Sequence, residues 1–243
     1  MITLTECPVC GYGPSVPNAN VLSPLKMDYF GHPAGVVVRY DRCTTCGTVF
    51  QNPRMSDEDL MRWYTSGEYR RITGSVETVD ADELERAQRI ASYGFRPNRH
   101  LDIGSSRGFL LREIGAAQQV GVEWNADWNR NPDAAILKEI PGEGKYDLIT
   151  LIHSLEHVTN PRDVLGRLGG LLAEDGVIWI EVPSLESKGG PYRLSHTFFF
   201  ELSSLMFMAG LAGLSLLNYK YTPHLFAAFE KKKLTGENND NLS

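Results

Sequence analysis

The sequence predicts an α/β protein with a doubly wound, mostly parallel sheet whose last strand is antiparallel, preceded by a small N-terminal metal-binding module. From residue 99 onward, short apolar strand patterns alternate with helix patterns, which is typical of a parallel sheet covered by helices. The last two strand patterns are joined only by Thr222-Pro223-His224, and so short a join requires an antiparallel pair. All four cysteines fall in two Cys-x-x-Cys pairs near the N-terminus.

Composition excludes several classes of protein. The 243 residues are 42% hydrophobic and 22% charged, so the chain can form a packed core and wholesale disorder is excluded. A formal net charge of −6 makes nucleic acid an unlikely partner. No window approaches the roughly 20 apolar residues of a membrane span, and the N-terminus does not resemble a signal peptide. We therefore expect a cytoplasmic protein without a membrane partner, and the oligomeric state stays open.

The cysteine pairs predict a structural zinc site. Cys7 and Cys10 form one pair, Cys43 and Cys46 form the other, and a glycine follows each pair. Two such turns supply the four thiolates of a closed tetrahedral site. The alternative is four free or redox-active thiols.

We expect four regions along the chain: a zinc-ribbon module over 1–55, a helix and a linker or lid over 56–81, the sheet domain over 82–231, and a polar tail over 232–243. Ser56 is the expected N-cap of the first helix, with Asp59 three residues on and Gly67 as its end.

Within the sheet domain, hydrophobic periodicity predicts each element in turn. The expected helices cover 82–94, the turn after Ile103 to Gly115, 161–176 and 201–213. The expected strands cover 100–103, 119–122, 147–152, 177–182, 214–221 and 225–231, and a short one lies near Ile136 and Leu137. Asn160 and Pro161 are an N-cap and a first-turn proline, and Gly176 is the expected helix end. Only a short or irregular helix fits between 123 and 147.

A glycine-rich turn follows the strand that ends at Ile103. Gly104, Ser106 and Gly108 are small enough to let the backbone approach a ligand closely. The spacing is Gly-x-Ser-x-Gly, which does not meet the Gly-x-Gly-x-x-Gly fingerprint of dinucleotide sites. Glu123 ends the next strand, where a carboxylate can bind both hydroxyls of a ribose. The alternative reading is a tight turn and a solvated strand end.

This combination resembles the class I S-adenosylmethionine (SAM)-dependent methyltransferases, with Ser106 in place of a middle glycine. The segments 146–149 and 152–157 are similar to the fourth-strand motif of that family. The resemblance implies a Rossmann-like sheet and a set of SAM-binding residues: Asp102, Gly104, Ser105, Ser106, Gly108, Glu123, Ile152 and His153. Ile136 or Leu137 are candidates for contact with adenine.

The segment from Arg42 to Tyr64, with its cysteine pair, is similar to the N-terminal zinc-binding part of a methyltransferase subgroup that includes sugar C-methyltransferases and enzymes of glycan biosynthesis. In the loop after the fifth strand, that subgroup has a tyrosine and a histidine three residues later. Here His196 matches the histidine, Arg193 replaces the tyrosine, and Tyr192 lies one place earlier. His196 is therefore a candidate catalytic base, or a substrate-binding or structural residue.

The leading functional hypothesis is methylation of a small molecule, namely a sugar, a nucleotide-sugar or a related metabolite. A second hypothesis is an RNA methyltransferase, because some of those enzymes carry an N-terminal zinc module. A third is a non-catalytic protein that keeps the cofactor fold for binding. Asp102, Gly104, Gly108 and Glu123, all in place, argue against the third.

Overall fold

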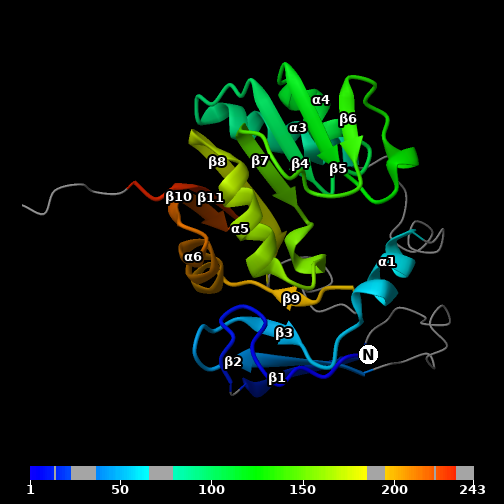
Figure 1. Ribbon diagram of the computed structural model, residues 1–243, viewed down its shortest axis with the longest axis vertical. Helices are drawn as coiled ribbons and strands as arrows, with labels where there is room; N and C mark the ends of the chain where they lie inside the picture. Colours follow the sequence, from blue (N-terminus) through cyan, green and yellow to red (C-terminus); the bar gives the residue numbers. More distant parts are fainter. Residues whose placement is uncertain (14, 23–36, 66–78, 185–194, 222, 234–243) are drawn as a thin grey trace, which may run out of the picture.

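The computed structural model describes residues 1–13, 15–22, 37–65, 79–184, 195–221 and 223–233. Two sheets lie one above the other in Figure 1, with the seven-stranded sheet at the top and a four-stranded sheet near the N-terminus below. Most of the expected linker or lid, the residues Tyr192 and Arg193, and most of the polar tail lie outside the described residues.

The seven-stranded sheet confirms the predicted mostly parallel arrangement. Its strand order is β10-β11-β8-β7-β4-β5-β6. The strands are β4 (Arg99–Ile103), β5 (Gln118–Val122), β6 (Ala134–Leu137), β7 (Tyr146–Ile152), β8 (Leu172–Pro183), β10 (Leu214–Tyr221) and β11 (His224–Lys231). Neighbours from β8 to β6 pair in parallel, whereas β11 runs antiparallel to both β8 and β10.

Helices cover both faces of this sheet, as the alternation of patterns predicts. In Figure 1, α3 (Val79–Ser92) and α4 (Phe109–Ile114) lie behind the sheet, and α5 (Pro161–Leu171) and α6 (Leu202–Leu211) lie in front. Side chains on consecutive strand positions point to opposite faces, so Leu148 packs with Ile90 on one side and Ile149 packs in the larger core on the other.

The N-terminal sheet contains a strand from the far end of the chain. Its order is β1 (Ser15–Leu22), β2 (Val37–Cys43), β3 (Val49–Gln51) and β9 (Phe198–Phe199), all antiparallel. In the last pair, Phe50 lies opposite Phe198 and Val49 opposite Phe199. All four side chains are buried, so the module shares a core with the segment that follows the fifth strand of the large sheet.

Helix α1 (Asp57–Thr65) connects the two parts and begins as predicted. The Ser56 hydroxyl accepts from the Asp59 N–H at 3.1 Å, which is the expected cap. The connection after Glu123 is irregular, with only a 3-10 turn, η2 (Ala126–Trp128). A second turn, η3 (Leu155–His157), follows β7. Across the described part of the chain, no helix has the length and apolar character to cross a membrane.

The predicted end of α5 at Gly176 is wrong. The helix ends at Leu171, and β8 begins at Leu172, which pairs with Tyr146. Gly176 instead lies where β8 passes closest to β7. A Cβ atom there would stand 2.9 Å from the carbonyl oxygen of Tyr146 and 3.1 Å from that of Asp147. The glycine thus permits a close approach between strands, a function that periodicity does not distinguish from a helix cap.

Substitution of Gly176 by alanine should therefore destabilise the fold by about 2 kcal/mol, because rigid backbone oxygens must move. A Cβ atom on Gly166, an exposed residue inside α5, meets nothing within 4 Å, so Gly166→Ala should stabilise by about 0.5–1 kcal/mol. Denaturant unfolding of both variants measures the two effects. Equal effects of the two substitutions would contradict this account of Gly176.

Candidate functional site

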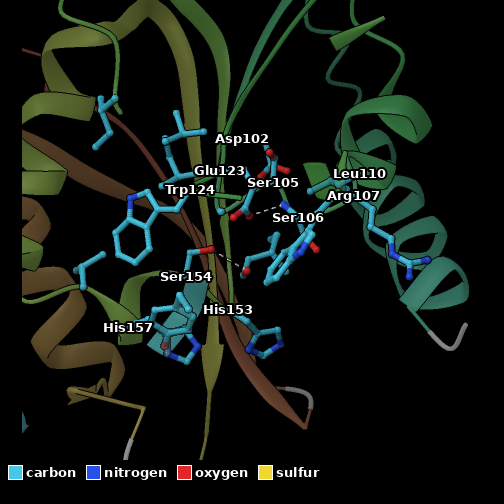
Figure 2. Close-up of a pocket in the computed structure, with 18 of the residues that line it drawn as sticks. Asp102, Ser105, Ser106, Arg107, Leu110, Glu123, Trp124, His153, Ser154 and His157 are labelled. Carbon is cyan, nitrogen blue, oxygen red and sulfur yellow. Dashed lines mark hydrogen bonds between the residues drawn. The ribbon is translucent and has the colours of Figure 1, made fainter. Parts of the chain in front are cut away.

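A cavity of about 680 Å³ opens at the carboxyl edge of the parallel strands, where ligands bind in open α/β sheets. Seven of the residues predicted to bind the cofactor line it: Asp102, Gly104, Ser105, Ser106, Glu123, Ile152 and His153. Figure 2 labels Asp102, Ser105, Ser106, Glu123 and His153. The eighth, Gly108, does not line the cavity. It caps α4, and a Cβ atom there would meet Asn129 at 2.5 Å and Asn131 at 3.0 Å.

The glycine turn has a backbone that few side chains tolerate. Gly104 has φ 75°, and a Cβ atom on it would stand 2.3 Å from Ser154 Oγ. Ser106 is also left-handed, with φ 48°. The backbone N–H groups of Gly104 and Ser105 both donate to the carbonyl of Val122, which fastens the turn to the end of β5. Glycine at position 104 therefore lets Ser154 pack directly against the backbone of the turn.

Glu123 lies on the cavity wall with its carboxylate fixed. The Ser106 N–H donates to Glu123 Oε2 at 3.1 Å, and the Asn125 N–H donates to Oε1 at 2.9 Å. Burial raises the pKa of Glu123, and these backbone donors oppose that rise. Each oxygen keeps a further lone pair, so an oriented carboxylate faces the cavity as an acceptor.

Sequence reasoning missed the apolar and aromatic walls of the cavity. Trp124, Trp128 and Ile140 line it, whereas Ile136 and Leu137, the candidates for adenine contact, do not. The tryptophans lie in the irregular segment after Glu123, where no periodicity marks them. Tyr64 reaches the cavity from α1, with its ring centroid 5.7 Å from that of Trp124.

The cavity fits the groups that SAM carries. The backbone of the turn at Gly104, Ser105 and Ser106 borders the cavity, the Glu123 carboxylate can accept from two hydroxyls, and indole rings offer apolar faces to a base. The volume is within the usual range of about 300–1,000 Å³ for small-molecule sites.

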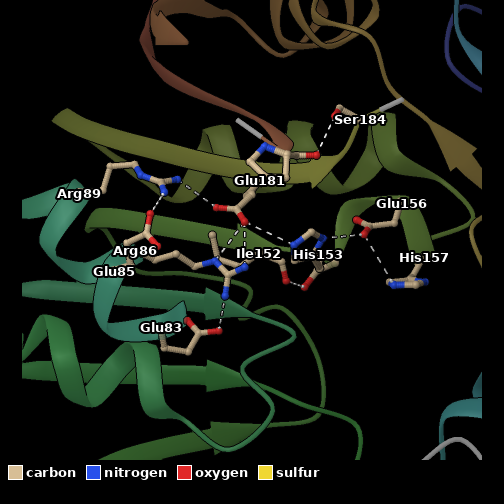
Figure 3. Close-up of polar contacts among 12 residues, drawn as sticks. Glu83, Glu85, Arg86, Arg89, Ile152, His153, Glu156, His157, Glu181 and Ser184 are labelled. Atoms are coloured by element: carbon tan, nitrogen blue, oxygen red, sulfur yellow. Dashed lines mark hydrogen bonds and ion pairs between the residues drawn. The ribbon is translucent and has the colours of Figure 1, made fainter. Parts of the chain in front are cut away.

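A series of side chains with alternating charge, which includes the cavity residues Glu83, Arg86 and His153, is shown in Figure 3. Arg86 from α3 donates to Glu83 at 3.0 Å and twice to Oε1 of Glu181, at 3.1 and 2.9 Å. The two ring nitrogens of His153 lie 3.4 Å from Glu181 and 3.4 Å from Glu156.

Two groups in this region have metal-ligand chemistry. Ligand atoms of His153, Glu181 and His224 lie within 4.8 Å of one another, and so do those of Glu156, His157 and His196. In the first group, the two donations from Arg86 already neutralise Oε1 of Glu181. An ion-pair network therefore accounts for that arrangement without a metal.

Ion pairing decides the charge of His153. Burial alone would lower its pKa, but Glu156 and Glu181 outweigh burial and raise it to about 9. Burial likewise opposes ionisation of the two glutamates, yet their cationic neighbours hold the pKa of each at about 2. His153 is thus a cation at neutral pH and cannot accept a proton there. Its φ of 49° places it in the left-handed region, so the loop is strained to bring the ring there.

His157, the last residue of the segment 152–157, lines the cavity. Its Nδ1 lies 2.8 Å from the carbonyl of Ser195, which can only accept, so Nδ1 carries a proton. The Tyr64 hydroxyl contacts the same Nδ1. His196 does not line the cavity. It is 7% exposed and packs behind His157, with ring centroids 4.8 Å apart.

The four cysteines converge in the N-terminal module. Cys7 Sγ lies 3.7 Å from Cys46 Sγ, and Cys10 Sγ lies 3.6 Å from Cys43 Sγ. A tetrahedron of sulfurs about 2.3 Å from a central zinc has edges of about 3.8 Å. Gly11 and Gly47 both have φ 74°, and their N–H groups donate to the carbonyls of Cys7 and Cys43. The four thiols are thus clustered between two similar turns that each end in a glycine.

The charge of His153 predicts a pH dependence of stability in the protein without ligand. The folded state raises the pKa of His153 from 6.5 to about 9, so its contribution is full below pH 6.5 and is lost as pH rises through 9. The stability difference between the wild type and His153→Gln should therefore shrink across that window. His224→Gln is the control, since the pKa of His224 is lowered by burial and by His153. Denaturant unfolding at several pH values tests this, and a constant His153→Gln difference would refute it.

Comparison with known proteins identifies the fold. A family model described as a methyltransferase domain matches residues 49–217. A search of curated protein sequences finds no match. Magnesium protoporphyrin IX methyltransferase from Synechocystis PCC 6803, solved with bound SAM, is 12% identical with a TM-score of 0.55, over 74% of this chain and 99% of that one.

Two further solved structures have a fold similar to that of this chain. The 1,6-didemethyltoxoflavin-N1-methyltransferase from Burkholderia thailandensis is 17% identical with a TM-score of 0.55, over 78% of this chain and 98% of that one. The CcbJ methyltransferase from Streptomyces caelestis is 16% identical with a TM-score of 0.51, over 63% and 92%. The family match spans most of the chain and includes the glycine turn, Glu123 and His153, so the chain belongs to the methyltransferase-domain family and is a SAM-dependent methyltransferase.

Proposed function

We propose that this enzyme methylates a small molecule, and that the acceptor is a sugar, a nucleotide-sugar or a related metabolite. The observation that carries the proposal is one cavity of about 680 Å³ that holds both the oriented Glu123 carboxylate and the imidazole of His157. A cofactor and a small acceptor can meet there. The magnesium protoporphyrin and toxoflavin enzymes named above also act on small molecules, which supports this choice.

We propose that SAM is bound by the seven cavity residues predicted from the sequence, together with Trp124 and Trp128. Bound SAM supplies a methyl group that is already activated as a sulfonium. The protein has then chiefly to align an acceptor with that group and exclude water. The left-handed backbone at Gly104 and Ser106 shapes the turn that borders the cofactor, and Glu123 holds the ribose.

For the acceptor proton, we propose that His157 accepts it and that His196, our candidate base from the sequence, acts through His157. Because Nδ1 of His157 faces the Ser195 carbonyl, the nitrogen that can take up a proton is Nε2, which lies 3.8 Å from Oε1 of Glu156. A hydroxyl or an acidic C–H acceptor needs such a base. His153 does not serve, because it is already protonated.

For the N-terminal module, we propose a structural zinc ion held by Cys7, Cys10, Cys43 and Cys46. The sulfur spacing and the two glycine turns support this assignment. With four protein ligands the ion has no open position for a substrate. Together with the helix that follows, the module supports the proposed kinship to the sugar C-methyltransferase subgroup.

The acceptor class can be tested by transfer of a labelled methyl group from SAM. Nucleotide-sugars, free sugars and bulk RNA should be offered in parallel to the wild type and to Glu123→Gln. Label in a sugar fraction that depends on Glu123 would support the proposal. Label in RNA would favour the second hypothesis, and SAM binding without transfer to any of the three would contradict the proposed acceptor class.

Glu123→Gln should weaken SAM binding at least tenfold. Two charge-assisted hydrogen bonds are each worth about 1.5 kcal/mol or more, and the amide would also turn an N–H toward a backbone donor. Calorimetry measures the change. Glu143→Gln is the control, since Glu143 is exposed and does not line the cavity. Wild-type affinity in Glu123→Gln would show that the ribose binds elsewhere.

Purified protein should contain one zinc ion per chain. Replacing Cys46 by serine should release it and destabilise the N-terminal module, because metal binding is coupled to folding of such a module. Thr45→Ala, an exposed position beside it, should keep the metal. Elemental analysis with thiol titration decides the matter: four reactive thiols and no metal in the wild type would exclude the site.

Once an acceptor is known, His157→Gln should lower kcat about 10²–10⁴-fold, with SAM affinity within roughly twofold. His196→Gln should give a smaller loss, because its ring lies behind that of His157. The rate of the wild type should fall at acid pH with an ionisation that His157→Gln lacks. Turnover near normal in both variants would remove the two histidines from the mechanism.

A further inference from the structure

Three polar side chains form a hydrogen-bonded chain inside the large sheet, below the cavity. His100 and Asp102 lie two residues apart on β4, and Thr150 pairs with Asp102 from β7. His100 and Thr150 are wholly buried and Asp102 is 4% exposed. Thr150 Oγ1 lies 2.6 Å from Asp102 Oδ1 and 2.8 Å from His100 Nε2. Only Asp102 reaches the cavity.

The hydrogen bonds that link Asp102, Thr150 and His100 allow two proton arrangements. When Asp102 is ionised, the Thr150 hydroxyl must donate to it, and the Thr150 oxygen then accepts from an Nε2–H of His100. When Asp102 is protonated, its O–H can donate to Thr150, and the hydroxyl then donates to a bare Nε2, which places the proton of His100 on Nδ1. The ionisation of Asp102 and the tautomer of His100 are thus coupled through one hydroxyl.

The surroundings of His100 favour the first arrangement. Its Nδ1 is buried and has no hydrogen-bond partner among the described residues. In the first arrangement this atom is an unused acceptor, whereas in the second it is a buried N–H without an acceptor. Orphaned buried N–H groups are the rarer and costlier of the two. Burial lowers the pKa of His100 to about 3, so the ring stays neutral and the tautomer is its only freedom.

The other charged groups that face Asp102 shift its pKa in opposite directions. Glu83 and Arg86 face it from α3, and Glu123 from the position just after β5. Burial raises the pKa of Asp102 to about 7; the two glutamates act in the same direction, and Thr150 and Arg86 oppose them. The hydrogen bond from Thr150 thus favours the ionised form of Asp102 against the effect of burial.

We propose that Thr150 and His100 are positioning residues that keep Asp102 ionised, so that its carboxylate can face a cationic group of the cofactor. The inference rests on the proposed placement of SAM in this cavity, since SAM carries both a sulfonium and an α-ammonium group. Neither Thr150 nor His100 touches the cavity, and both act through the charge of Asp102.

The charge of Asp102 can be observed directly by NMR of protein labelled with ¹³C at the aspartate carboxyl carbon, with Asp102→Asn used for assignment. In the protein without ligand, Thr150→Val should raise the titration midpoint of Asp102 by about one pH unit, because an ionised oxygen loses its donor. Thr150→Ser keeps the hydroxyl and should restore the wild-type midpoint. The nitrogen shifts of His100 at pH 8 should show the proton on Nε2.

Ligand binding gives the second readout. Adding SAM should lower the Asp102 midpoint by more than one pH unit in the wild type, whereas 5′-methylthioadenosine, an uncharged nucleoside, should leave it unchanged. In calorimetry at pH 6.5, Thr150→Val should bind SAM about tenfold more weakly and methylthioadenosine as the wild type does. A merely structural defect would weaken both ligands alike.

Three results would overturn the inference: an Asp102 midpoint that Thr150→Val leaves unchanged, a His100 proton on Nδ1 at pH 8, or equal loss of both ligands. Failure of SAM to bind the wild type at all would instead contradict the proposed cofactor site, so the two failures are distinguishable. Circular dichroism of Thr150→Val checks that the variant is folded. If it is not, the Thr150→Ser and wild-type titrations with SAM and methylthioadenosine still decide whether Asp102 responds to a cation.

Discussion

The shape of the candidate site depends on how the short segment 195–199 is held. Its Thr197 N–H donates to the carbonyl of Glu156 at 2.8 Å, and its Thr197 carbonyl accepts from the Gln51 N–H at 2.8 Å. The Tyr40 hydroxyl donates to the carbonyl of His196 at 2.8 Å. The same backbone is therefore tied on one side to the turn that carries His157 and on the other to the N-terminal sheet. Without either tie, the Ser195 carbonyl would not meet the ring of His157.

Pairing of opposite charges explains why so many ionisable groups can be buried side by side. A buried carboxylate is costly unless a cation compensates it, and the order Glu83, Arg86, Glu181, His153, Glu156 alternates sign at every step. The alternation leaves His153 cationic and His157 to face the cavity. Asp102 lies beside this chain but is compensated by hydrogen bonding rather than by a direct ion pair, which is why its charge is the more easily changed.

Local sequence patterns predict most of the large sheet, because its strands are short apolar runs and its turns contain glycine, asparagine or proline at the positions where the backbone needs them. The glycine turn, Glu123 and His153 are predicted for the same reason, since each directly follows a strand. Local patterns fail where contacts between residues distant in the sequence determine the structure. Gly176 lies against a neighbouring strand and does not cap a helix, and Phe198–Phe199 completes a sheet that begins at Ser15. Tyr64, Trp124 and Trp128 reach the cavity from irregular or distant segments without a periodicity of their own.

The strand Phe198–Phe199 also bears on the order in which the molecule folds. The Tyr40–His196 hydrogen bond spans 156 positions, whereas the hairpin of β10 and β11 closes over a few residues. Contacts between such distant segments form late, since a long loop must be closed before any contact compensates its lost entropy. On a growing chain, the edge of β3 must stay unpaired until Phe198 and Phe199 have been synthesised. The wall of the cavity that carries His157 is thus completed among the last parts of the protein, and the exposed edge of β3 is the place where an unfinished chain is most prone to pair with the wrong strand.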